Sequence, residues 1–333
     1  MKYISFLVPC YNSQDYMEKC IESLLIGKDD VEIIIVDDGS KDNTGKIADR
    51  YAKKYPKTIK VVHQENGGHG EGINTGLKVA TGKYFKVLDS DDWVDEKAYK
   101  TLLKKIKNID SDLIVMNYVY TYTDGRKNQV INFSNVFKND QEMTWDETGK
   151  FKTTQYLSLH SLMYKKSVLD KTNIKLPKHC FYEDNLFIYL PLKNTKTVYY
   201  LDLDFYQYYI GRADQSVNEE MLIKRSSHQV LVTKLACNAY DLDTIKNKKL
   251  RKIMYRECVF LMSVGVLFSR LMMSDEGEKQ FKELWASIKK ENPKLYKKMR
   301  HFTLASLASL PGKFGRAVCV NVYKFAHHLV KFN

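Results

Sequence analysis

The sequence predicts an α/β fold: a Rossmann-like, mainly parallel sheet with flanking helices, followed by an all-helical C-terminal region. Over the first 120 residues, short apolar runs alternate with longer amphipathic patterns, which is typical of βαβ units. From about residue 221 onward the pattern is helical. The charge balance changes at the same place, so we expect two domains, residues 1–220 and residues 221–333.

The elements of the first domain can be predicted in order from these patterns. The expected strands are apolar and rich in β-branched residues, as buried strands are: Tyr3–Val8, Val31–Val36, Ile59–His63, Lys83–Leu88 and Leu113–Tyr118. Between them, apolar residues recur at spacings of three and four, which predicts helices. These cover Gln14–Ile26, with Ser13 as its N-cap, Thr44–Lys54, Gly70–Ala80 and Glu96–Lys107.

The pattern changes after residue 120. Residues 121–150 lose the periodicity, and Asp124-Gly125 predicts a hairpin turn within them. Residues 151–217 indicate mixed strand and loop, with a helix at about Asp184–Leu192. In the C-terminal region the longest helical patterns cover Arg251–Met273 and Gly277–Lys290.

The 333-residue chain has a net charge of +13, and the positive excess lies in its last third. Residues 1–220 carry 31 Lys and Arg against 32 Asp and Glu, whereas residues 221–333 carry 22 against 8. A region of one sign implies an anionic partner, such as lipid headgroups, nucleic acid or an acidic polymer. No recognised nucleic-acid-binding motif accompanies the charge, so we do not expect nucleic acid to be that partner.

The last helical pattern carries an apolar stripe, with Lys, Arg and His on its other faces. The stripe consists of Phe314, Val318, Val322, Phe325, Leu329 and Phe332. A basic amphipathic helix of this kind lies in the plane of an anionic membrane surface. The alternative is that the stripe packs on the first domain or on a second copy of the chain in a homo-oligomer. The sequence leaves both interpretations open.

Neither a targeting signal nor a membrane span is predicted. The first residues lack the apolar run and cleavage site of a secretory signal. The longest weakly charged apolar stretch, Cys258–Phe268, is about half the ~20 residues that a membrane span needs. We therefore expect a cytoplasmic protein, and we hypothesise that its basic helices attach it peripherally to the inner face of the cell membrane.

Polar segments follow the first four predicted strands. They are Pro9–Asn12, Asp37–Ser40, Glu65–Gly68 and Asp89–Asp92. In an open parallel sheet, ligands bind outside the carboxyl ends of the strands. Each segment alone is also an ordinary turn sequence, but the four together predict a ligand site at this edge of the sheet.

Asp89-Ser90-Asp91 predicts a divalent cation within that site. Mg²⁺ takes oxygen ligands, often one or two carboxylates together with the phosphates of a substrate. No G-x-x-x-x-G-K-[ST] sequence is present, which excludes a P-loop. The glycines of Gly67–Gly72 lack the G-x-G-x-x-G register, which argues against a dinucleotide site of the dehydrogenase kind.

Five ordered motifs make the sequence recognisable: VPCYN, VDDGSKDNT, ENGG with GINTGLKVATGKY, LDSDDW and FYEDNLF. Their succession resembles the family 2 glycosyltransferases of the GT-A fold, over roughly residues 1–217. The resemblance implies an inverting, metal-dependent transferase that takes a sugar from a nucleotide-diphosphate donor, UDP-linked by family tendency. The acceptor would be a hydroxyl of a cell-surface polysaccharide, teichoic acid or lipid-linked glycan.

The resemblance also implies roles for individual residues. Contacts to the nucleotide sugar are implied for Pro9, Tyr11, Asn12, Asp38, Asn66, Gly67, Asn74, Asp89 and Ser90, of which Pro9, Tyr11 and Asp38 would hold the base. Asp91, with Asp89, would ligate Mn²⁺ or Mg²⁺ on the diphosphate. Glu183 and Asp184 would supply the catalytic base, preferably Asp184. A loop with Arg212, Gln215 and Ser216 would close over the diphosphate or acceptor, and an ordinary polar loop is the alternative.

The chemistry of glycosyl transfer agrees with these roles. A divalent cation stabilises the departing diphosphate as a Lewis acid, and a base must deprotonate the acceptor hydroxyl. If one carboxylate does so on the face opposite the leaving group, the anomeric centre inverts. The alternative interpretation of Glu183-Asp184 is an acidic pair that only caps a helix.

One departure from the family pattern concerns the donor site. Many relatives have an A-R-N run where this chain has Gly72-Ile73-Asn74, so an Arg is absent. Either His69 and Glu71 compensate for it, or His69 is an ordinary surface histidine.

Two other functions remain as alternatives: a non-catalytic nucleotide-sugar-binding scaffold of a glycan-assembly complex, and a nucleotidyltransferase. The loop PCYNSQD argues against the latter, because it lacks the expected Gly and Arg or Lys.

Overall fold

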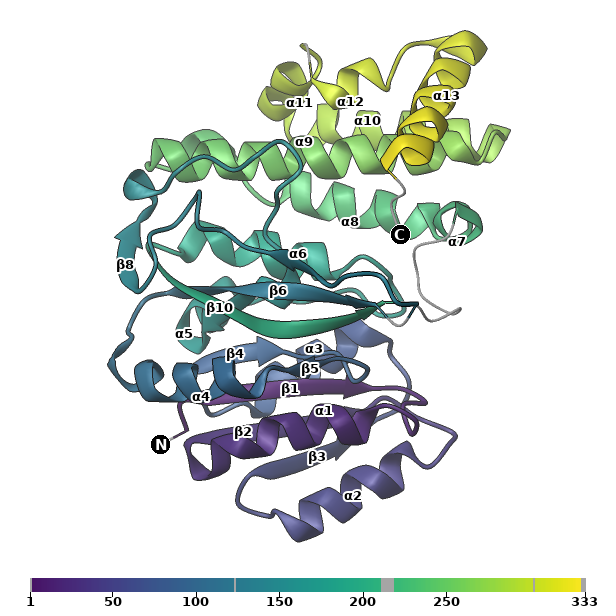
Figure 1. The fold of residues 1–333 in the computed structure, drawn as a ribbon. Helices are drawn as coiled ribbons and strands as arrows, with labels where there is room; N and C mark the ends of the chain where they lie inside the picture. The colour runs from purple at the N-terminus through teal and green to yellow at the C-terminus, as the bar shows by residue number, and fades with distance from the viewer. Residues whose placement is uncertain (1, 123, 211–218, 302, 331–333) are drawn as a thin grey trace. The chain divides into compact units, whose positions relative to one another are not determined.

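The computed structural model describes residues 2–122, 124–210, 219–301 and 303–330. The chain divides into two compact units, Met1–Arg212 and Ala213–Asn333. The first contains a sheet with helices around it, and the described part of the second is helical (Figure 1).

The first unit is built on one mixed sheet with the strand order β3-β2-β1-β4-β9-β6-β10-β5. Its four parallel strands are β1 (Ile4–Cys10), β2 (Val31–Asp37), β3 (Ile59–His63) and β4 (Tyr84–Val87). β1, β2 and β4 are buried along their whole length, which explains why they read as continuous apolar runs rather than as alternating ones.

The other half of the sheet contains the antiparallel pairs. Its strands are β5 (Trp93–Val94), β6 (Leu113–Tyr122), β7 (Gln129–Ile131), β8 (Gln141–Thr144), β9 (Leu162–Lys165) and β10 (Thr197–Ile210). β9 pairs antiparallel with both β4 and β6, and β6 then runs parallel to β10. β6 and β7 form the hairpin predicted at Asp124-Gly125, where Gly125 has a φ of 84° that favours glycine.

Helices flank this sheet, as the sequence predicts (Figure 1). They are α1 (Met17–Leu24), α2 (Thr44–Lys54), α3 (His69–Val79), α4 (Glu96–Lys105), α5 (Lys166–Thr172) and α6 (Asp184–Tyr189). The predicted α/β class, a sheet with flanking helices followed by a helical region, is therefore confirmed.

The start of the first helix is where the prediction was wrong. α1 begins at Met17, its N-cap position is Tyr16, and no side chain caps it. Ser13 lies one turn earlier, where its carbonyl accepts hydrogen bonds from the N–H groups of Tyr16 and Met17. Its hydroxyl lies 2.8 Å from that of Ser90, so Ser13 joins two loops instead of capping a helix.

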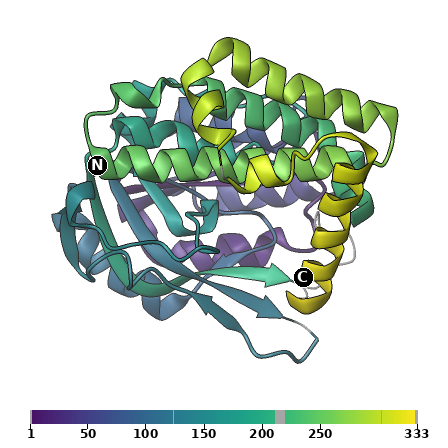
Figure 2. The same ribbon diagram turned by 90° about the horizontal axis from the view of Figure 1, so that it is seen from above.

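All secondary structure among the described residues of the second unit is helical. Its helices are α7 (Glu219–Lys224), α8 (Ser226–Asn238), α9 (Lys248–Leu271), α10 (Asp275–Glu291), α11 (Pro293–Met299), α12 (Leu304–Leu307) and α13 (Gly312–Val330). α8, α9 and α10 pack against one another (Figure 2). At their crossing, a Cβ on Gly265 would lie 3.0 Å from both Leu284 Cδ2 and Thr233 Oγ1, so glycine allows the close approach.

The predicted C-terminal helix is present as α13, but its burial differs from the predicted stripe. Phe314 is 78% exposed, whereas Val320, which is not in the stripe, is buried. The stripe residues Val322, Phe325, Leu329 and Phe332 lie outside the described side chains. Among the described residues, no helix is both long and apolar enough to cross a membrane.

Candidate functional site

Most of the predicted site residues of the first unit lie at the carboxyl ends of β1, β2, β3 and β4 and at the start of α6, and Asn74 lies within α3. Tyr11 follows β1 and is 50% exposed, so its ring is available to a ligand. Pro9 is buried within β1. Asn12 has a φ of 49°, and its side-chain oxygen accepts a hydrogen bond from the Lys41 N–H.

Asp38 organises the next loop. One carboxylate oxygen accepts from the Gly67 N–H at 2.8 Å and from Gln64 Nε2 at 2.6 Å, and the other accepts from the Gly68 N–H at 2.7 Å. Asn66 donates to the Asp38 carbonyl at 2.8 Å. Because these bonds occupy most of its acceptor capacity, Asp38 shapes the glycine turn from which α3 begins.

The Asn74 side chain also makes several hydrogen bonds to neighbouring parts of the fold. Its amide donates to Glu71 and to the Leu176 carbonyl, and its oxygen accepts from the Leu176 N–H, all at 2.9 Å. Lys178 lies 3.4 Å from the other oxygen of Glu71. Asn74 therefore ties α3 to the segment that precedes α6, and Glu71 takes part in the same connection.

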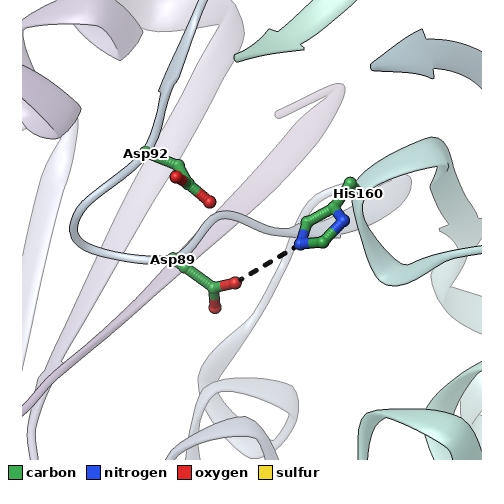
Figure 3. A group of neighbouring side chains, drawn as sticks. All are labelled: Asp89, Asp92 and His160. Carbon is green, nitrogen blue, oxygen red and sulfur yellow. Dashed lines mark ion pairs between the residues drawn. The ribbon is translucent and has the colours of Figure 1, made fainter. Parts of the chain in front are cut away.

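An acidic turn after β4 faces a histidine from a distant segment. One ligand atom each from Asp89, Asp92 and His160 lie within 4.8 Å of one another (Figure 3). His160 Nε2 is 3.9 Å from Asp89 Oδ2. Asp92 is buried, with one oxygen accepting from the Tyr206 hydroxyl at 2.6 Å and the other from the Tyr209 N–H at 2.8 Å.

The protonation states of this group suit a cation. Burial lowers the pKa of His160 to about 4, so the imidazole is neutral at pH 7. Its Nδ1 lies 2.9 Å from Ser158 Oγ, and in the tautomer in which Nδ1 donates to that hydroxyl, Nε2 is unprotonated and available to a cation. Burial and the charges of Asp91 and Asp89 raise the pKa of Asp92 well above its usual range. A bound cation would relieve that crowding of carboxylates, so these residues fit a divalent metal.

Asp91, which the sequence predicts as a metal ligand, lies on the same turn and is partly exposed. It is not a member of the converging group, in which Asp92 and His160 accompany Asp89. Asp92 stands in the same LDSDDW motif, but the sequence alone does not distinguish it as a ligand. His160 lies in a 3₁₀ turn, Leu159–Ser161, that carries no motif, so only the tertiary structure reveals it.

A buried lysine supports the 3₁₀ turn that carries His160. Lys86 on β4 is fully buried, and its Nζ donates to the carbonyls of Leu159 at 2.9 Å and His160 at 2.6 Å. Burial lowers the pKa of Lys86 to about 7. The His160 ring also packs against Tyr206 and Tyr208, with ring centroids 4.7 and 4.4 Å away.

His69 connects the acidic turn to the Glu183-Asp184 pair. Its Nε2 is 3.0 Å from Asp89 Oδ1, and its Nδ1 is 2.7 Å from Glu183 Oε1. Burial would lower the pKa of His69, but the two carboxylates outweigh it and raise the pKa well above its usual value. In the same way, burial would raise the pKa of Asp89, but His69 outweighs burial and lowers it to about 2. The alternative that His69 is an ordinary surface histidine is therefore wrong.

Glu183 and Asp184 stand at the start of α6 in different surroundings. Glu183 occupies the N-cap position, but its side chain makes no capping hydrogen bond and turns to His69 instead. Burial, together with the charge of Glu183, raises the pKa of Asp184 to about 7. One carboxylate is thus held by an ion pair, and the other can gain or lose a proton near neutral pH.

Ser90, Gly67 and the loop with Arg212 are the remaining residues predicted to contact the nucleotide sugar or the acceptor. Ser90 lies on the acidic turn beside Ser13, and the Gly67 carbonyl accepts from the His179 N–H at 2.7 Å. Arg212, Gln215 and Ser216 lie outside the described residues. The first unit therefore brings the acidic turn, His69 and the Glu183-Asp184 pair together, with Tyr11 exposed on the neighbouring loop.

Comparison with known proteins supports the assignment of this fold. Glycosyltransferase GlyG of Streptococcus pneumoniae serotype 4 is 41% identical over 125 residues, which cover 37% of this chain and 41% of that protein. The uncharacterized glycosyltransferase EpsJ of Bacillus subtilis is 30% identical over 208 residues, covering 62% of this chain and 60% of EpsJ. This chain thus spans less than two thirds of the length of either relative.

Solved structures share the fold at low sequence identity. Staphylococcus aureus TarS in complex with UDP-GlcNAc superposes with a TM-score of 0.66 at 20% identity, covering 98% of this chain and 91% of that chain. A mannosyltransferase from Pyrobaculum calidifontis in complex with GDP-Man and Mn²⁺ gives a TM-score of 0.54 at 14% identity, covering 99% and 88%. The sequence profile described as "Glycosyl transferase family 2" matches residues 5–172, about half of the chain. The chain belongs to glycosyl transferase family 2.

Proposed function

We propose that this protein is an inverting, metal-dependent glycosyltransferase. It moves a sugar from a nucleotide-diphosphate donor, a UDP-sugar, to a hydroxyl of a cell-surface polysaccharide, teichoic acid or lipid-linked glycan. The observation that carries the proposal is the convergence of Asp89, Asp92 and His160 with the Glu183-Asp184 pair, which His69 connects. This arrangement puts cation ligands and a candidate base in one site.

The donor assignment has support from the structural neighbours. TarS was solved with UDP-GlcNAc, and the mannosyltransferase with GDP-Man and Mn²⁺. In this chain the exposed Tyr11 ring would stack on the nucleotide base. Asp89, Asp92 and His160 would hold Mn²⁺ or Mg²⁺, which when bound would supply charge neutralisation to the leaving diphosphate.

The base is assigned to Asp184 because of its protonation equilibrium. A general base works best when its pKa lies near the working pH, and the pKa of Asp184 is about 7. Asp184 would accept the proton of the acceptor hydroxyl, whose oxygen attacks the anomeric carbon from the face opposite the diphosphate. Glu183 remains in its ion pair with His69 and positions the start of α6.

The acceptor and the location of the enzyme belong to the same proposal. The 22 Lys and Arg against 8 Asp and Glu in residues 221–333 support contact with an anionic surface, such as the inner face of the cell membrane. We place the protein in the cytoplasm, peripherally attached where a lipid-linked acceptor is accessible.

The proposal is tested by calorimetric titration of UDP into the protein, once with Mn²⁺ and once with EDTA. We expect binding with Mn²⁺ that weakens at least ~10-fold in EDTA or in Asp89→Asn, because the carboxylate ligand is lost. Asp124→Asn, an exposed aspartate of the β6–β7 hairpin, removes the same charge away from the site and is the control. Equal affinity with and without metal contradicts the cation's role, and no binding of UDP under either condition overturns the UDP assignment.

A further inference from the structure

The helical unit contains a cavity of about 390 Å³. It is bounded by the first two turns of α9, by α11 and by the 3₁₀ turn Leu242–Thr244. All of its lining residues belong to this unit, from Asp241 to His301. The cavity is therefore separate in sequence from the candidate catalytic residues, and its volume is that of a small-molecule site.

Cations dominate the lining of this cavity. Lys248, Arg251 and Lys252 come from α9, and Lys294 and Lys298 come from α11. The carboxylates in the lining are Asp241 and Asp243, which pair with Lys294 at 2.9 Å and with Lys298 at 2.7 Å. These two ion pairs neutralise the two lysines that α11 contributes to the lining. The lining cations of α9 take no part in them.

Arg251 and Lys252 follow Lys248 by three and four residues, and all three side chains line the cavity. No carboxylate lies within ion-pair distance of Lys248, Arg251 or Lys252 in the part of the chain that the structure describes. They also stand in the first two turns of a 24-residue helix, whose N-terminal end adds positive potential. Three cations without a paired carboxylate at one cavity have the charge and the donors that a multiply charged oxyanion requires.

Apart from His301, the rest of the wall is apolar or already hydrogen-bonded. Leu242 and Leu295 are buried and line the cavity. Asn292 uses its amide to donate to the carbonyls of Cys237 at 2.9 Å and Tyr240 at 3.0 Å. The Tyr255 hydroxyl donates to the Lys298 carbonyl at 3.2 Å, so its ring forms a fixed wall. A ligand with one charged end and a short uncharged body suits such a lining.

We propose that this cavity binds a phosphate ester of a polyol or sugar. The Arg251 guanidinium matches phosphate oxygens with paired N–H donors, and Lys248 and Lys252 supply further charge from the same face. The cavity is larger than a phosphate group requires, so the polyol or sugar body occupies the space beside Tyr255 and the two leucines. The same chemistry is present in soluble phosphate esters and in phospholipid headgroups.

The test measures binding of glycerol phosphate to the full chain by calorimetry in EDTA at low ionic strength. We expect saturable binding that the double variant Arg251→Gln/Lys252→Gln weakens at least ~10-fold, since charge-assisted hydrogen bonds to phosphate are lost. The matched control is Lys282→Gln/Lys289→Gln, which removes the same charge from exposed positions of α10 and should bind like the unaltered protein. Circular dichroism shows whether both variants are folded.

A second arm distinguishes a soluble ester from a headgroup. Vesicles of phosphatidylcholine with one quarter phosphatidylglycerol are sedimented with each protein at the same ionic strength. Loss of co-sedimentation in the α9 variant alone, without binding of free glycerol phosphate, assigns the cavity to a lipid headgroup. Binding that falls equally in the two double variants shows a diffuse charge effect and overturns the proposal. Absence of binding in both arms also overturns it.

Discussion

A single histidine determines how the charges of the candidate site are arranged. His69 contacts Asp89 and Glu183, two carboxylates separated by 94 positions in the sequence. By taking one oxygen of Asp89, it leaves the other oxygen facing His160. By pairing with Glu183, it leaves Asp184 as the carboxylate with a pKa near neutrality. The different protonation behaviour of Glu183 and Asp184 thus follows from one ion pair.

At this scale, the pH dependence of activity follows from Asp184. Burial raises its pKa to about 7, so the carboxyl group is protonated below that pH. In that form it cannot take the proton from the hydroxyl of the acceptor substrate. We expect kcat/KM for sugar transfer to rise with pH through about 7 and to level off above it. Asp184→Asn should lower turnover by about 10²–10⁴-fold while leaving the affinity for UDP nearly unchanged.

The comparison of turnover with binding separates an enzyme from a nucleotide-sugar-binding scaffold. A radiolabelled UDP-sugar measures turnover, and calorimetry measures UDP affinity in the same preparations. If Asp184→Asn retains turnover and the same pH profile as the unaltered protein, another group is the base.

Sequence motifs predict some of these residues and miss others for a physical reason. Asp89, Glu183 and Asp184 stand at a strand end and a helix start, which local patterns reveal. His160 and Lys86 act through contacts between segments far apart in the chain, and a lysine inside the apolar strand YFKVL gives no sign of its partner. The side chains that support a site are a property of tertiary packing.

At the scale of elements, the same distinction holds for the fold. Helix α2 and strand β3 lie at the residues predicted for them, because each is specified by its own periodicity. The sequence does not predict that β9 inserts antiparallel between β4 and β6, since strand order depends on long-range pairing. β6 likewise extends to Tyr122, beyond its predicted end, because it pairs with β7 on one side and β10 on the other.

The 3₁₀ turn Leu159–Ser161 is the element on which His160 depends, and Lys86 positions that turn. We expect Lys86→Met to raise the Mn²⁺ concentration needed for UDP binding about tenfold, because metal ligands lose affinity when their supporting hydrogen bonds are removed. The control is Lys83→Met, beside the same strand, which removes a lysine bond to the Ile109 carbonyl outside the site.

Both substitutions remove a lysine-to-carbonyl bond, so both lower thermal stability, and only the site variant shifts the metal titration. The measurement is a Mn²⁺ titration of UDP affinity, with the melting temperature of each variant recorded. An unchanged Mn²⁺ midpoint in folded Lys86→Met would show that Lys86 contributes to stability alone.

At the scale of the whole molecule, the chain combines a nearly neutral sheet unit with a strongly basic helical unit. The charge difference is visible in the sequence, and the boundary in the structure lies at Arg212. Each unit has its own buried core: Phe6, Ile34 and Tyr84 in the first, and Met254, Val266 and Leu284 in the second. Separate cores imply that the units can lose stability independently.

This independence can be measured with one core substitution in each unit. Leu284 is fully buried at the α9–α10 crossing, where it approaches Gly265, so Leu284→Ala should destabilise the helical unit by about 3 kcal/mol. We expect thermal unfolding, followed by circular dichroism, to show an earlier first transition while UDP affinity at low temperature stays within about twofold. Leu7→Ala, at a buried position of β1 near Gly76, should instead destabilise the sheet unit and weaken UDP binding. A single transition that both variants shift equally would mean that the two cores unfold as one cooperative unit.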